Sequence, residues 1–167
     1  MTGAANKGKS AEKIIRDILD TFNSRVAGFT FNRVPDAHMA GGRFPAQAGD
    51  FQAFRKLANV NQMGAGTPPQ MFSMTEVPQS RNFIVEVKEV KHDFRLPQKN
   101  YSEDKVARVQ KRVWAGTEAV VAVLHTTTGL WRLVPFAVFT ERRPSWDLSG
   151  YAHVDIEAAL AEFMGVN

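Results

Sequence analysis

The sequence contains no cysteine and only four histidines. Without cysteine there can be no disulfide bonds and no thiolate metal sites, so a bound metal must use oxygen or imidazole ligands. The histidines show no spacing typical of a metal site, which disfavours a histidine-based hydrolase. Any metal is therefore expected to be Mg²⁺, for which Mn²⁺ can substitute, held by oxygen ligands.

Long apolar runs are also missing. No stretch approaches the roughly 20 apolar residues of a membrane span, and the first residues do not follow the basic-then-apolar pattern of a signal sequence. The 167 residues, 44% of them hydrophobic, are enough for one domain with its own core. We expect a single cytoplasmic domain over residues 1–167, without a membrane partner.

Basic residues are scarce in the last third of the chain and concentrated in the first two thirds. Residues 1–112 hold 18 Lys and Arg against 11 Asp and Glu, whereas residues 113–167 hold 3 against 6. A basic region of this kind suits a polyanion such as nucleic acid. A mildly basic surface without any partner is the alternative.

The hydrophobic pattern predicts an α/β domain with a mixed central sheet of about five strands flanked by helices. Residues 55–80 show no sustained period and are rich in Gly and Pro, which indicates an inserted loop or hairpin. Residues 142–149 are expected to form a loop. Helices are predicted over 10–26 with Ser10 as N-cap, 103–115, 135–139 and 155–164, and strands over 29–34, 50–54, 82–89, 119–124 and 130–134.

The predicted strand over residues 82–89 carries two charges in an otherwise apolar run. Successive side chains of a strand alternate between its faces, so Glu86 and Lys88 should share one face, and Val85 and Val87 the other. A carboxylate and an ammonium at this spacing can hold a divalent cation beside a positive group that acts on an anion or a water. An edge strand with a solvated charged face is the alternative.

Two further acids could join this strand. Glu12 lies three residues before Ile15, on the apolar stripe of the first helix, although an acid in a first turn also suits the helix dipole. Asp50 opens the run Asp-Phe-Gln-Ala-Phe, although an Asp after Gly is also common in turns.

A helix acid, a strand Asp and a strand Glu-x-Lys, in this order, resemble the PD-(D/E)XK nuclease superfamily, whose restriction-endonuclease-like core is then the expected fold. Asn6–Glu12, Arg43–Phe51 and Phe83–Glu89, with the segment Phe94–Asn100 that follows, are similar to RecU-type Holliday junction resolvases. The short chain suggests a phage version. Asp50 and Glu86 are 36 residues apart, farther than in the bacterial family, and Asp36 competes with Asp50 for the role of metal ligand.

The resemblance implies a Mg²⁺-dependent endodeoxyribonuclease that cleaves four-way DNA junctions during recombination, repair or replication. Glu12, Asp50, Glu86 and Lys88 would be catalytic, and the metal would be held by Asp50, Glu86, the backbone carbonyl of Val87 and Glu12. Symmetric cleavage of a junction needs two sites related by a two-fold axis, hence a homodimer. Candidate phosphate contacts are Lys7, Lys9, Arg43, Arg95, Lys99, Arg108 and Arg112.

Two other functions fit the same residues. A nuclease of this superfamily could act on duplex or single-stranded DNA ends without regard to branching. A relative could also bind DNA without cutting it. Mg²⁺-dependent cleavage compared among junction, duplex and single strand separates these alternatives.

Overall fold

The computed structural model of the chain describes residues 8–34, 49–57, 80–91 and 95–166. Five strands form the main sheet and two short ones a second sheet. In chain order the elements are α1 (Gly8–Arg25), β1 (Phe29–Arg33), β2 (Phe51–Lys56), β3 (Ser80–Val90), β4 (Arg95–Pro97), the 3₁₀ turn η1 (Gln98–Asn100), α2 (Glu103–Trp114), β5 (Glu118–His125), β6 (Leu130–Pro135), the 3₁₀ turn η2 (Phe136–Thr140), β7 (Ser145–Asp147) and α3 (Ile156–Met164).

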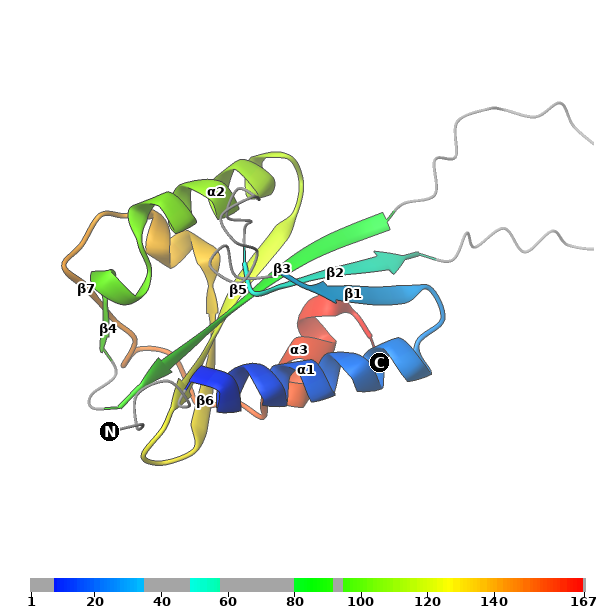
Figure 1. Cartoon of the computed structure of the whole chain (residues 1–167), viewed down its shortest axis with the longest axis horizontal. Coiled ribbons are helices and arrows are strands. Elements are labelled where there is room, and N and C mark those ends of the chain that lie inside the picture. Colours follow the sequence, from blue (N-terminus) through cyan, green and yellow to red (C-terminus); the bar gives the residue numbers. More distant parts are fainter. Residues whose placement is uncertain (1–7, 35–48, 58–79, 92–94, 167) are drawn as a thin grey trace, which may run out of the picture.

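The main sheet has the order β1-β2-β3-β5-β6. β3 pairs in parallel with β5, whereas the other neighbours are antiparallel. The sheet is therefore mixed and five-stranded, which confirms the predicted fold class. Helices α1 and α3 lie against one face of the sheet, and α2 lies over the other (Figure 1).

The face under α1 and α3 carries one apolar core. Ile15, Leu19 and Phe22 are buried there, as the helical stripe predicted. The helix begins at Gly8 and not at Ser10. Ser10 is therefore inside the first turn, and its prediction as N-cap is wrong. The last helix begins at Ile156, and its N-cap Asp155 accepts a hydrogen bond through its side chain from the backbone N–H of Ala158.

The opposite face carries a second core, formed with α2 and the segment after β6. Val109 of α2 is buried against Tyr101, Phe139 and Trp146. The predicted loop over 142–149 is wrong in part, because Ser145–Asp147 forms β7 and pairs with β4. The buried indole of Trp146 holds this short strand against the core.

The segment 55–80, which the sequence predicts as an inserted loop or hairpin, overlaps the sheet at both of its ends. β2 continues through Lys56 and β3 begins at Ser80, so both ends of the predicted segment belong to the sheet. Residues 58–79 lie outside the described residues. Among the helices that the structure describes, none is long and apolar enough to cross a membrane.

Candidate functional site

Strand β3 turns Glu86 and Lys88 toward α2. Its neighbours Val85 and Val87 pack in the core under α1, whereas Ile84 belongs to the core under α2. The alternation predicted from the sequence is therefore confirmed. Glu86 is only 1% exposed, so its carboxylate lies inside the protein and not on a solvated edge. A carboxylate in this position needs compensating charge or ligands.

Asp50 reaches the same place from the residue just before the start of β2. Phe51 pairs with Val85 in the antiparallel ladder, so the preceding residue lies beside Glu86. The Asp50 carboxylate accepts a hydrogen bond of 2.7 Å from the backbone N–H of Val87. This bond fixes the carboxylate at the point where the β2–β3 ladder ends.

Gly49 makes this approach possible. Its φ of 80° lies in the left-handed region, which favours glycine. A Cβ atom at this position would lie 2.4 Å from Cγ2 of Ile84, too close for any side chain. The glycine before Asp50 is thus required by both backbone conformation and packing.

Lys105 of α2 completes the cluster. Its Nζ lies 3.1 Å from Oδ1 of Asp50 and 2.5 Å from Oε1 of Glu86. Lys88 forms a further ion pair with the same Glu86 oxygen. Two carboxylates and two ammonium groups therefore meet at one point, with Lys105 between the carboxylates.

Lys105 is not among the site residues predicted from the sequence, so this role was missed. The sequence feature that could have indicated this role is the spacing between Lys105 and the apolar residues of α2. Lys105 precedes the buried Val109 by four residues, which places it at the margin of the apolar stripe of α2.

The charges in the cluster act on one another. Burial raises the pKa of Glu86, the nearby charge of Asp50 raises it further, and the two lysines oppose this, with a net increase. For Lys105, burial lowers the pKa, but the charges of Glu86 and Asp50 and the hydrogen bonds to them outweigh burial and the net shift is upward. The Lys105 ammonium is therefore firmly charged while it lies between the carboxylates.

Glu12 is not part of this cluster in the described structure. Its carboxylate pairs with the Arg33 guanidinium of β1 at 2.7 Å. Within the described ranges, no three acidic or histidine side chains are grouped so that they could hold one metal ion. The metal roles of Glu12 and of the Val87 carbonyl remain predictions.

The two carboxylates of the cluster form a donor set for a divalent cation. Asp50 and Glu86 offer the hard oxygen ligands that Mg²⁺ prefers. Oε2 of Glu86 is buried and has no hydrogen-bond partner among the described residues. A buried carboxylate oxygen without a partner is costly, and a cation between the two carboxylates would satisfy it. The residues fit such an ion, provided that the Lys105 ammonium makes room.

The predicted phosphate contacts fall into two groups. Arg95 of β4, Lys99 of η1 and Arg112 of α2 are exposed, and Arg108 of α2 is partly exposed. Arg112 follows Lys105 by seven residues, about two helical turns, and therefore lies on the same side of the helix. The side chains of Lys7, Lys9 and Arg43, and of the competitor Asp36, lie outside the described part of the chain.

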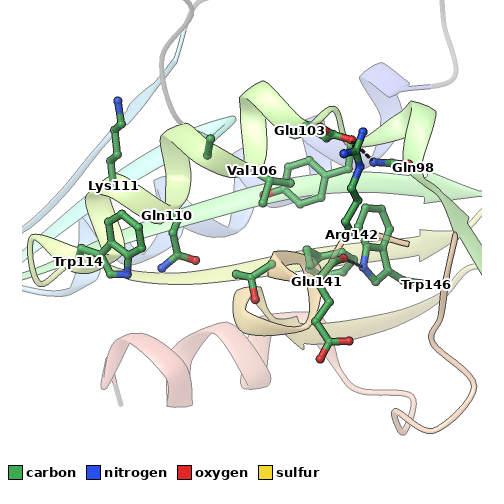
Figure 2. A pocket seen from close by; sticks show the side chains of 13 residues that line it. Gln98, Glu103, Val106, Gln110, Lys111, Trp114, Glu141, Arg142 and Trp146 are labelled. Carbon is green, nitrogen blue, oxygen red and sulfur yellow. Dashed lines mark hydrogen bonds and ion pairs between the residues drawn. The ribbon is translucent and has the colours of Figure 1, made fainter. Parts of the chain in front are cut away.

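A separate pocket of about 450 Å³ lies on the other flank of α2. Trp114 and Gln110 point from the helix to one side, and Lys111 extends away from them (Figure 2). Glu103, which also lines the pocket, pairs with Arg142 at 2.7 Å. Neither Asp50 nor Glu86 lines this pocket, so it is distinct from the cluster of charged residues.

No protein family matched the sequence, and no curated protein matched it. Among solved structures, the chain is similar to Hjc of Archaeoglobus fulgidus, described as a Holliday junction resolvase from an archaeal hyperthermophile. The match has 24% identity and a TM-score of 0.49, and it covers 90% of this chain and 98% of that chain.

Proposed function

We propose that the protein is a divalent-metal-dependent endodeoxyribonuclease that cleaves four-way DNA junctions. The observation that carries the nuclease proposal is the meeting of Asp50, Glu86 and Lys88 beside the start of β2. The two acids are 36 residues apart in the chain, yet their side chains share one ammonium partner. A buried carboxylate beside a second one, with a lysine two residues farther along the same strand, suits metal-assisted hydrolysis of a phosphodiester.

In this proposal Asp50 and Glu86 hold the metal. When bound, a divalent cation supplies a Lewis acid at the phosphate and makes a water more acidic. The Val87 N–H keeps the Asp50 carboxylate oriented. Lys88, paired with Glu86, orients the attacking water and offsets the charge that develops on the phosphate.

The position of the Lys88 ammonium is stabilised by an aromatic ring. Its Nζ lies 5.1 Å from the centre of the Tyr101 ring, which is fully buried. A cation over an aromatic face is held by electrostatic attraction. Tyr101 thus limits where the Lys88 ammonium can move, without taking part in the reaction.

The choice of DNA as substrate rests on charge. The basic side chains of α2 continue from the cluster along one side of the helix to Arg112, where they can bind successive phosphates. The choice of a four-way junction rests on the resemblance of the sequence motifs to those of RecU-type resolvases. A homodimer belongs to this proposal, since two strands must be cut symmetrically.

The test is cleavage of a synthetic four-way junction, a duplex of the same sequence and a single strand, each with Mg²⁺ and with EDTA. Glu86→Gln should lower the cleavage rate by about 10³-fold or more, because it removes a metal ligand whose effect is felt in the transition state. Lys88→Ala should also be strongly impaired. Glu89→Gln is the matched control, because Glu89 lies on the same strand and accepts a bond from the Ala11 N–H under α1.

Each substrate pattern has a distinct meaning. Preferential, Mg²⁺-dependent cutting of the junction supports the proposal. Equal cutting of duplex or single strand indicates a nuclease without selectivity for branching. Junction binding without cleavage by the wild-type protein indicates a non-catalytic DNA-binding protein.

A further inference from the structure

We propose that Lys105 is an internal counter-cation of the metal site, whose ammonium lies between Asp50 and Glu86 until a divalent cation displaces it. The inference rests on the proposed function, since it concerns the same site. It adds a competition between a side chain of α2 and the metal.

Geometry places the Lys105 ammonium at the centre of the site. Nζ is 3.1 Å from one carboxylate and 2.5 Å from the other, so it bridges the two groups that would have to share a divalent cation. Lys88, in contrast, pairs with Glu86 alone among the acidic side chains that the structure describes. Only Lys105 therefore has to move if both carboxylates bind one ion.

Burial explains why such a counter-cation is needed. Glu86 is 1% exposed and the Asp50 side chain is 14% exposed. Two carboxylates held together away from water repel each other, and each lacks most of its hydration. A lysine that neutralises them keeps the metal-free protein folded, at the expense of metal affinity.

The displaced Lys105 side chain can move from the site into solvent. The Lys105 side chain is 28% exposed, so its end can reach solvent without unfolding α2. The basic residues Arg108 and Arg112 follow it on the same side of the helix. Once displaced, its ammonium lies where a DNA phosphate would be bound, so that metal binding adds a positive group to the DNA-binding side.

The experiment measures Mn²⁺ binding without DNA, by electron paramagnetic resonance of the free ion. Lys105→Met removes the charge and keeps the length of the side chain. It should bind Mn²⁺ about tenfold or more tightly than the wild type, because a competing cation within contact distance of both ligands has gone. Lys111→Met is the control on an exposed position of the same helix, and should leave the affinity unchanged.

Thermal unfolding supplies a second measurement on the same variants. Lys105→Met should melt below the wild type in EDTA and recover most of that difference in saturating Mn²⁺. A lysine with a purely structural role would give the same deficit in both conditions. That result, or an affinity for Mn²⁺ no tighter than that of the wild type, would overturn the inference.

A measurement on the wild type keeps the proposal testable if the variant does not fold. Acylation of lysines, followed by mass spectrometry, should be slow at Lys105 in EDTA and faster with Mg²⁺, whereas Lys111 should react alike in both. An unchanged rate at Lys105, in a protein that binds the ion, contradicts displacement. If the wild type and Lys105→Met both fail to bind Mn²⁺, the proposed metal-dependent function fails as well. Binding by the wild type without a gain in the variant rejects the role of Lys105 alone.

Discussion

The two faces of the central sheet are built from similar strands but differ in charge. Under α1 and α3 the buried side chains are apolar. Under α2, the same strands bring in Glu86 and Arg132, the two charged side chains that are buried among the described residues. Arg132 lies between Trp131 and Leu133, which both belong to the α1 core, and so faces α2. The comparison indicates that both faces carry an apolar core, and that the face under α2 also carries the charges of the proposed site.

The largest expected effect comes from the apolar face. Leu19→Ala should lower the free energy of unfolding by about 2–5 kcal/mol, because it leaves a cavity in a fully buried core. Urea denaturation measures the change. Ile14→Ala, at a position of the same helix that is 38% exposed, should cost much less. Equal losses of unfolding free energy for Leu19→Ala and Ile14→Ala would mean that burial in this core does not stabilise the fold.

Gly49→Ala should have the next largest effect, at the boundary between the two faces. We expect a loss of about 2–4 kcal/mol, because a side chain at this φ is strained and its Cβ would collide with Ile84. Cleavage should fall as well, since Asp50 would move. Gly150→Ala is the control, because nothing lies within 4 Å of its added Cβ. Urea denaturation measures both variants. If Gly49→Ala proved as stable as Gly150→Ala, this role of Gly49 would be contradicted.

Glu86→Gln should change stability much less, although it abolishes the proposed activity. We expect the free energy of unfolding in EDTA to change by about 1 kcal/mol or less, because Lys105 keeps Asp50 as a partner and the repulsion between the two carboxylates is removed. Burial and Asp50 raise the pKa of Glu86, which means that a neutral group is easier to bury there. This gain offsets the ion pairs that Lys88 and Lys105 lose. A loss as large as that of Leu19→Ala would show that the charged face is structural after all.

Much of the difference between the two faces of the sheet could be predicted from the sequence, because it depends on local periodicity. The alternation of Glu86 and Lys88 with Val85 and Val87 follows from strand geometry, and the stripe of α1 follows from helical spacing. The mixed sheet follows from the order of the elements. These features need no knowledge of how distant segments meet.

The parts that were missed depend on contacts between distant segments. Lys105 enters the site from α2, 55 residues after Asp50 in the chain. Its spacing to Val109 places it beside the apolar stripe of the helix but does not show which distant carboxylates it meets. β7 is only three residues long and exists because β4 pairs with it. The expected convergence of Glu12 with the strand acids was not found in the described structure, where Arg33 of the neighbouring β1 forms an ion pair with it.

The smallest expected effect lies on the outer flank of α2. Glu103, Ala107, Gln110 and Trp114 follow one another at spacings of four, three and four residues, so they form one stripe that lines the separate pocket. Trp114 is 78% exposed. Trp114→Ala should therefore change the free energy of unfolding by about 0.5 kcal/mol or less, and leave junction cleavage and Mn²⁺ affinity at the wild-type level. Urea denaturation measures the stability, and the junction-cleavage and Mn²⁺-binding assays measure the other two quantities. A large fall in cleavage with unchanged stability would place the outer flank in contact with DNA. The division of α2 into a functional side and an outer side without a role in cleavage would then have to be abandoned.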